Sequence, residues 1–179
     1  MRMSDLELDP TLLATLQTLE AQDVEFVLVG EVAEAIYNNG GFVSGVAIVP
    51  GAYSRNVDRL CSALLELGAE LSPEAGLLDL RHADLRELAP CTFMTSRADI
   101  DVDFEPQNTR GYRDLFDDAS RIGLAPGVNP LVASSADLAR IARDTTTPSV
   151  PYAKPPAVLP PEPSVGEIQA GEQIRVSRF

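Results

Sequence analysis

The chain has 179 residues, 45% of them hydrophobic, and its formal net charge at neutral pH is -13. That length has room for one domain with its own hydrophobic core. No apolar run is long enough to span a bilayer, and the charged N-terminal residues lack the apolar stretch of a signal peptide, so we expect a cytoplasmic protein that does not enter a membrane. The negative charge argues against an extended nucleic-acid groove, because it repels phosphate backbones, and it favours solubility or a basic protein partner.

Cysteine and histidine are too scarce to build a zinc site. The chain has two cysteines, Cys61 and Cys91, and one histidine, His82, whereas a structural zinc ion takes four such ligands. Both cysteines fall within segments of apolar pattern. We therefore expect two buried free thiols in a reducing compartment rather than a disulfide.

Hydrophobic periodicity and turn residues predict alternating helices and strands. Asp9 and Pro10 are typical of a helix start, because the aspartate accepts a free N–H group and proline lacks one. Gly30 and the cluster at 38–41 are typical of turns, and Gly68 is typical of a helix end. The predicted elements are, in chain order, a helix over 10–22, a strand over 25–29, a helix over 31–37, a strand over 43–49, a helix capped by Ser54 and reaching 67, an ambiguous stretch with a strand at 77–80 and a helical turn at 84–88, strands over 91–95 and 99–104, a helix over 111–120, a strand within 128–132, and a last helix from Ser134 or Ser135 to about Asp144.

Acidic residues alternate along the strand predicted over 99–104. A period of two places four carboxylates on one face and three apolar side chains toward the core. The carboxylates belong to Asp99, Asp101, Asp103 and Glu105, and the apolar residues are Ile100, Val102 and Phe104. Three interpretations stay open: a solvated acidic face on which Arg97 pairs with Asp99, a residual single-metal site that takes Glu31 as a replacement ligand, and a docking face for a basic partner.

The composition of the chain changes at Thr145. Seven of the fourteen prolines lie within 145–179, and they favour an extended polyproline conformation. We expect residues 1–144 to form the domain and residues 145–179 to form an extended or disordered proline-rich tail. The tail could also serve as a docking peptide, or its alternating second half could add an edge strand within this molecule or to a second copy, which would make a homo-oligomer.

Several short motifs follow one another in a recognisable order. Val27-Leu28-Val29 precedes Gly30 and a helix, Leu67-Gly68-Ala69 follows a later helix, and Ser135-Ala136-Asp137-Leu138-Ala139-Arg140 with Arg143-Asp144 closes the domain. Over residues 10–144 this order resembles the nucleotidyltransferase fold, as found in bacterial nucleotidyltransferases grouped with abortive-infection toxins. The resemblance implies a mixed α+β domain, with a mixed sheet flanked by helices. It puts Asp101 at the family's third metal-ligand position, beside Gly45 and Ala47.

The chemistry of that family depends on residues that this chain lacks. Its members hold two Mg²⁺ ions on three strand-borne carboxylates, and the ions neutralise the triphosphate and activate the attacking oxygen. The resemblance puts Gly45 and Ala47 at the two Asp-x-Asp positions, where neither side chain can bind a metal. Gly30 keeps part of the phosphate-binding turn, but Glu31 puts a carboxylate where the phosphate would lie.

We therefore predict a degenerate nucleotidyltransferase-like protein without transfer activity. It would be kept for a binding or regulatory role with a protein partner and no cofactor, with a toxin–antitoxin or defence-related complex as one context. The alternative is an active enzyme that binds Mg²⁺ through Asp99, Asp101 or Asp103 and a relocated ligand such as Glu31. A further alternative is an unrelated small α/β fold, which requires that the strands at 25–29, 43–49 and 99–104 are not neighbours in one sheet.

Overall fold

The computed structural model describes residues 8–38, 40–41, 43–71 and 84–142. By its internal contacts the chain divides into two units, Met1–Thr147 and Pro148–Phe179. All described residues belong to the first unit, so the tail predicted over 145–179, the strand predicted at 77–80 and His82 lie outside them. Within the described ranges, no helix has the length and apolar character needed to cross a membrane.

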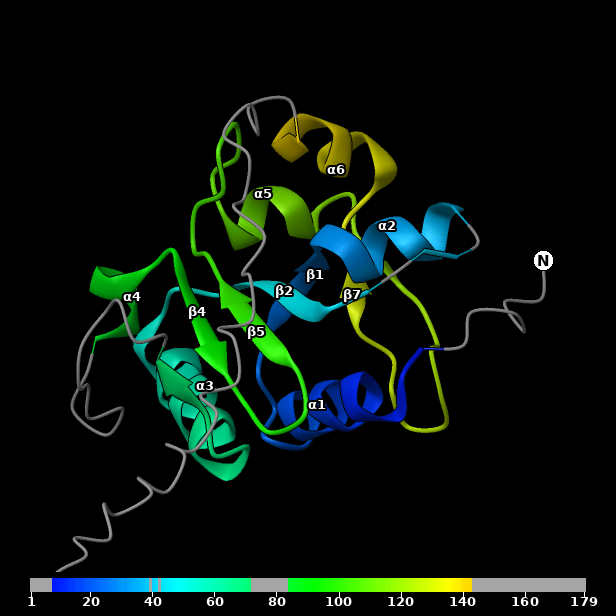
Figure 1. Cartoon of the computed structure of the whole chain (residues 1–179). Helices are drawn as coiled ribbons and strands as arrows, with labels where there is room; N and C mark the ends of the chain where they lie inside the picture. Colours follow the sequence, from blue (N-terminus) through cyan, green and yellow to red (C-terminus); the bar gives the residue numbers. More distant parts are fainter. Residues whose placement is uncertain (1–7, 39, 42, 72–83, 143–179) are drawn as a thin grey trace, which may run out of the picture. The chain divides into compact units, whose positions relative to one another are not determined.

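In the described part of the chain, a mixed sheet of seven strands forms the centre of the first unit (Figure 1). β1 pairs antiparallel with β2 and parallel with β7, while β2 pairs parallel with β5. The three strands predicted near 25–29, 43–49 and 99–104 are thus neighbours in one sheet. The alternative of an unrelated fold required that they are not neighbours. The sheet order is β3-β4-β5-β2-β1-β7-β6, with β1 (Phe26–Val29), β2 (Gly45–Pro50), β3 (Glu70–Leu71), β4 (Cys91–Met94), β5 (Asp99–Val102), β6 (Ser120–Arg121) and β7 (Leu131–Val132).

Helices surround this sheet in two groups (Figure 1). α1 (Pro10–Ala21) and α3 (Ser54–Glu66) contact each other and lie at the bottom of the view, and α5 (Tyr112–Phe116) and α6 (Ser135–Ala142) lie at the top. α2 (Gly30–Asn38) continues directly from β1 and contacts β2 and α6. A single helical turn, α4 (Leu85–Leu88), precedes β4.

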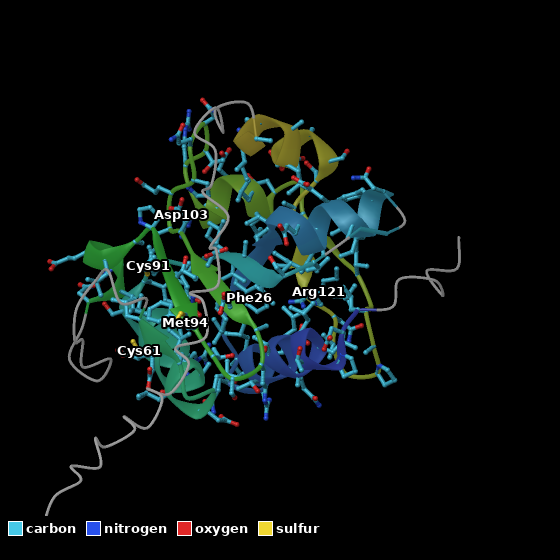
Figure 2. The ribbon with its side chains drawn as sticks, viewed as in Figure 1. Phe26, Cys61, Cys91, Met94, Asp103 and Arg121 are labelled. Carbon is cyan, nitrogen blue, oxygen red and sulfur yellow. The ribbon has the colours of Figure 1, made fainter. Side chains whose placement is uncertain are left out.

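The two cysteines, labelled in Figure 2, are both free and partly buried. Buried free thiols were expected from the sequence, whereas both side chains are only partly buried. Burial raises the pKa of the Cys61 thiol above its ordinary value. Burial, followed by the negative charges of Asp101 and Asp103, raises the pKa of Cys91 to about 11. Both thiols are protonated at neutral pH and make poor nucleophiles, because the thiolate is the reactive form.

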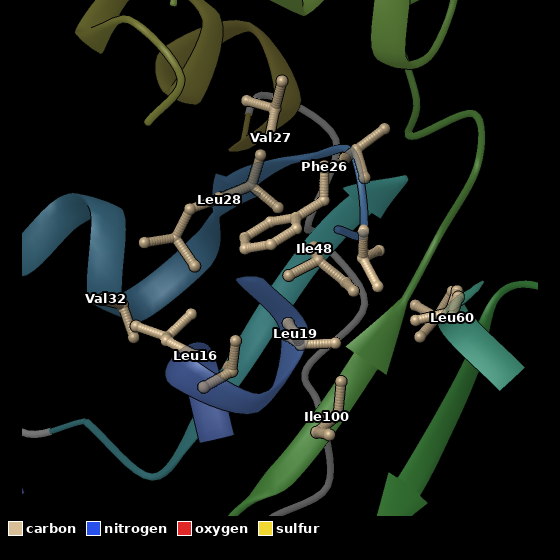
Figure 3. Packing of buried hydrophobic residues seen from close by; sticks show 14 of the residues in the cluster. Leu16, Leu19, Phe26, Val27, Leu28, Val32, Ile48, Leu60 and Ile100 are labelled. Atoms are coloured by element: carbon tan, nitrogen blue, oxygen red, sulfur yellow. The ribbon is translucent and has the colours of Figure 1, made fainter. Parts of the chain in front are cut away.

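Large apolar side chains fill the space between the sheet and α1 and α3 (Figure 3). Leu16 and Leu19 of α1 and Leu60 of α3 are fully buried close to Ile48 of β2 and Ile100 of β5. Burying a side chain of this kind contributes about 1.5–3 kcal/mol to stability. Because Ile100 points into this core, the residues on either side of it in β5 point outward.

Local patterns predicted some helix boundaries correctly and missed others. Asp9 accepts a hydrogen bond of 2.8 Å from the backbone nitrogen of Thr11, so the predicted cap of α1 is confirmed. Tyr53 rather than Ser54 occupies the cap position of α3, and its side chain makes no capping bond. The helix predicted over 111–120 ends at Phe116 instead, because residues 120–121 pair with β7 as an edge strand.

Candidate functional site

The register between β2 and β5 brings the predicted site residues together. Gly45 pairs with Asp99, and Ala47 pairs with Asp101, along the parallel ladder. Cα atoms paired across neighbouring strands lie about 5 Å apart, and their side chains share one face of the sheet. Asp101 therefore lies directly beside Ala47 and two residue pairs along the ladder from Gly45, as the resemblance implied.

The turn at Gly30 brings the end of β1 against the same part of β2. The φ angle of Gly30 is +64°, in the left-handed region that favours glycine. A Cβ built on Gly30 would lie only 2.9 Å from the Cβ of Ala47. Glycine is required at this position because other residues adopt this backbone angle only with strain, and because a side chain would collide with Ala47 of β2.

Gly45 is confined in a similar way by the neighbouring strand. A Cβ at this position would lie 2.8 Å from the backbone oxygen of Asp99 and 3.5 Å from the Cβ of the same residue. Rotation of a side chain cannot relieve a contact with a backbone atom, so β2 and β5 would have to move apart. The carboxylate missing at position 45 therefore cannot be restored by a substitution alone.

Glu31 lies in the first turn of α2 and is held by the segment that enters β2. Its Oε2 atom accepts hydrogen bonds of 2.9 Å from both the backbone nitrogen and the Oγ of Ser44. The negative charge that the start of a helix favours is thus supplied by the protein itself. Glu31 has a structural partner in the same chain, which fixes its carboxylate at the edge of the predicted site.

The carboxylates on and after β5 are separated rather than gathered. Asp101 accepts a hydrogen bond of 2.5 Å from Thr92 Oγ1 of β4, and Asp103 accepts one of 3.0 Å from the backbone nitrogen of Glu105. Asp99 and Asp101 are exposed to solvent. In the described part of the chain, the expected ion pair between Arg97 and Asp99 does not form.

This arrangement does not fit a magnesium ion. Among the described residues, no group of three or more histidine, cysteine, aspartate or glutamate side chains is placed to hold a metal. Asp99, Asp101 and Asp103 follow one strand, where residues two positions apart lie about 6.5–7 Å from each other. Mg²⁺ needs oxygen ligands at about 2.1 Å in octahedral geometry, so ligands from other elements would have to complete the site.

No protein-family model matches the chain, and no curated protein matches it either. The nucleotidyltransferase relationship therefore remains a hypothesis. It rests on the order of the elements, on the glycine turn after β1 and on the register that places Asp101 beside Ala47.

A second polar region, which the sequence analysis missed, lies at the opposite end of β1. Three cavities of about 440, 400 and 420 Å³ open there, and Glu25 and Tyr112 line all three. Four of the eight arginines within the described ranges also line them: Arg59, Arg110, Arg113 and Arg121. Phe26 and Arg121, both from the first cavity, are labelled in Figure 2. The wall residues come from distant segments without any regular spacing, so no sequence motif pointed to them.

Proposed function

We propose that this protein is a degenerate nucleotidyltransferase-like protein, a pseudoenzyme that acts by binding rather than by group transfer. One observation carries the proposal: Gly45 and Ala47, which have no metal-binding side chains, pair with Asp99 and Asp101 along the β2–β5 ladder. Two-metal transfer needs clustered carboxylates to hold the ions that neutralise the triphosphate. Each group removed from such a site costs several kcal/mol of transition-state stabilisation.

Two further contacts support the loss of catalysis. The Asp99 backbone oxygen occupies the space that a Cβ on Gly45 needs. The Glu31 carboxylate is bonded to Ser44 at the start of α2, where it would repel a triphosphate. The first contact opposes a metal-binding side chain at position 45, and the second opposes nucleotide binding.

The binding role that we propose is with a protein that carries a basic surface. The net charge of -13 and the exposed carboxylates of Asp99 and Asp101 support this choice. Complementary charge accelerates association and suppresses wrong partners. The resemblance to toxin-related enzymes suggests a toxin–antitoxin or defence-related complex as the context, with the protein in a regulatory position.

Titration and transfer assays test the proposal. Calorimetry with Mg²⁺ or Mn²⁺ and each nucleoside triphosphate should show no binding, and incubation with labelled nucleotides and RNA or protein acceptors should show no transfer. Robust metal-dependent transfer that is abolished by Asp101→Ala would overturn the proposal. It would favour the alternative of an active nucleotidyltransferase, in which a relocated ligand such as Glu31 completes the site.

A further inference from the structure

We propose that the cavity between the start of β1 and the start of α5 binds a small zwitterion, a molecule with an amino group and a carboxylate or phosphate group. The cavity has a volume of about 400 Å³, which lies within the usual range for small-molecule sites. Its walls carry both signs of charge and three aromatic rings. The charged residues include Glu25, Arg110 and Arg113, and the rings belong to Tyr53, Phe104 and Tyr112.

The charged wall residues do not neutralise one another. Within the described residues, Glu25 forms no ion pair, and neither do the guanidinium groups of Arg110 and Arg113. Arg59, which lines the adjoining cavity, is already paired with Asp23. Its guanidinium group forms an ion pair of 3.8 Å with the Asp23 carboxylate and donates a hydrogen bond of 2.9 Å to the Asp23 backbone oxygen. A carboxylate and two guanidinium groups therefore line one cavity and remain available to a ligand that carries both charges.

A buried asparagine fixes the wall on which Glu25 lies. The side chain of Asn56 is fully buried, and its Oδ1 accepts a hydrogen bond of 2.7 Å from the Glu25 backbone nitrogen. Its Nδ2 donates to the backbone oxygens of Glu25 and Gly51 at 2.8 and 2.9 Å. The segments before β1 and after β2 are thus tied together without a ligand, which lowers the entropic cost of binding.

The aromatic rings suit the cationic end of the ligand. The Tyr53 ring rests on Gly51, where an added Cβ would lie 2.8 Å from its Cε1 atom. Burial, hydrogen bonding to Glu25 and the charge of Glu25 raise the pKa of Tyr53 to about 12, and burial and the Glu25 charge also raise the pKa of Tyr112. Both phenols are therefore neutral near Glu25 at physiological pH. Their ring faces attract ammonium groups, so an amino group held by Glu25 gains a second favourable contact.

A second carboxylate in the cavity sharpens the expected selectivity. Glu105 shares these walls with Arg110 and Arg113, so the cavity is lined by two carboxylates and two guanidinium groups. A ligand with only negative charge would be repelled by Glu25 and Glu105, and a ligand with only positive charge would be repelled by the arginines. Glu25 precedes β1, whereas Gly30 and the predicted catalytic remnant follow it, so this inference does not depend on whether transfer activity is lost.

The test compares probes that differ by one charge. Binding of the twenty free amino acids and of phosphoethanolamine is measured by two-dimensional NMR and calorimetry at low ionic strength. At least one zwitterion should bind and perturb the amides of residues 25, 53 and 112. Each control probe lacks one charge: the N-acetyl form of an amino acid lacks the cation, its amide form lacks the anion, and ethanolamine lacks the phosphate of phosphoethanolamine. Each should bind at least about tenfold more weakly than the zwitterion, because one charged contact is lost.

Variants then assign each charge to its partner. Glu25→Gln should weaken binding of the zwitterion about tenfold, and it should bind the zwitterion and the form without an amino cation equally well. Arg113→Gln should weaken binding of the zwitterion by the same factor, and it should bind the zwitterion and the form without an anion equally well. Glu34→Gln and Arg97→Gln make the same charge changes at exposed positions outside the cavity and should leave binding unchanged. Failure of every probe at millimolar concentration, or equal binding by the charge-blocked forms, would overturn the proposal. Binding unaffected by Glu25→Gln and Arg113→Gln would also overturn it.

Discussion

Gly30 and Ala47 form the closest approach between the turn after β1 and the strand that would carry the catalytic carboxylates. The missing side chain on Gly30 allows the Cβ of Ala47 to occupy that space. The same glycine adopts a backbone angle that other residues reach only with strain. A single residue thus determines how the start of α2 meets β2.

Gly30→Ala should therefore destabilise the protein through both terms. The backbone angle costs about 1–2 kcal/mol, and the overpacked contact with Ala47 adds at least about 1 kcal/mol. Gly68→Ala is the matched control, because Gly68 has nearly the same φ, +63°, and no atom lies within 4 Å of an added Cβ. Urea unfolding of both variants separates the contact from the backbone term. Equal losses of stability would show that the contact with Ala47 is easily relieved.

Ala47→Asp is the substitution most able to recover metal binding. It adds a carboxylate directly beside Asp101 in the β2–β5 register, and two adjacent carboxylates attract a divalent cation. The variant should be less stable than the parent without metal and should gain thermal stability on addition of Mn²⁺. Ala47→Asn, which has the same shape without the charge, should show no such gain. Equal responses of the two variants to Mn²⁺ would show that position 47 does not face a usable site.

At the scale of elements, the sequence predicted those parts that depend on neighbours along the chain. The alternation after Ala98 predicted which face of β5 is buried, because a strand exposes every second side chain. The end of α5 was wrong because Ser120 and Arg121 are set by their pairing with β7, about ten residues further along. The hydrogen bonds between Glu31 and Ser44 also join residues 13 positions apart, with most of α2 between them, and no local pattern specifies such a bond.

The candidate sites show the same limit. The side-by-side placement of Ala47 and Asp101 was expected only through the resemblance to the nucleotidyltransferase fold, because β2 and β5 are far apart in the sequence. The cavity around Glu25 could not be expected, since its walls combine residues from four segments between 25 and 113, including the start of α5. No pattern within any one of these segments indicates that the four meet at one cavity.

Asn56 of α3 is bonded to the segments before β1 and after β2, so its removal should destabilise the packing of all three elements. Asn56→Ala removes three hydrogen bonds to the backbones of Glu25 and Gly51, and the one to the Gly51 oxygen is buried. The expected loss is about 2–4 kcal/mol in the free energy of unfolding, measured by urea denaturation. Ser62→Ala in the same helix removes only an exposed bond to the Asp58 backbone oxygen and should cost less than about 0.5 kcal/mol. Similar losses for both would contradict the linking role of Asn56.

At the scale of the whole molecule, the excess of 27 acidic over 14 basic residues makes stability sensitive to salt. Repulsion between like charges destabilises the compact state, and salt screens it over about 8 Å at physiological strength. Raising the NaCl concentration from low to physiological values should increase Tm by about 2–5 °C. Asp99→Asn should raise Tm at low salt and lose that advantage at high salt. A Tm that is independent of salt would show that the charges are already well compensated.

Alkaline pH should weaken the fold through Cys91. Its pKa is about 11 in the folded protein and near the ordinary 9.0 in the unfolded chain. The contribution is fully present below pH 9 and is lost as the pH rises through 11, because the unfolded thiol ionises first. After allowance for solvent access to this half-buried group, the loss is roughly 1 kcal/mol. Urea unfolding between pH 8 and 11 should show a steeper decline for the parent than for Cys91→Ala, and parallel declines would contradict the shift.

The contact between Gly45 and Asp99 also constrains how the protein can evolve. Any larger residue at position 45 collides with a backbone atom of the next strand, so an acidic substitution would first pass through a less stable protein. An acidic substitution at position 45 becomes acceptable only after a separate substitution has moved β5. Laboratory selection for metal binding should therefore recover ligands at Ala47 and in the surrounding loops long before it recovers one at Gly45.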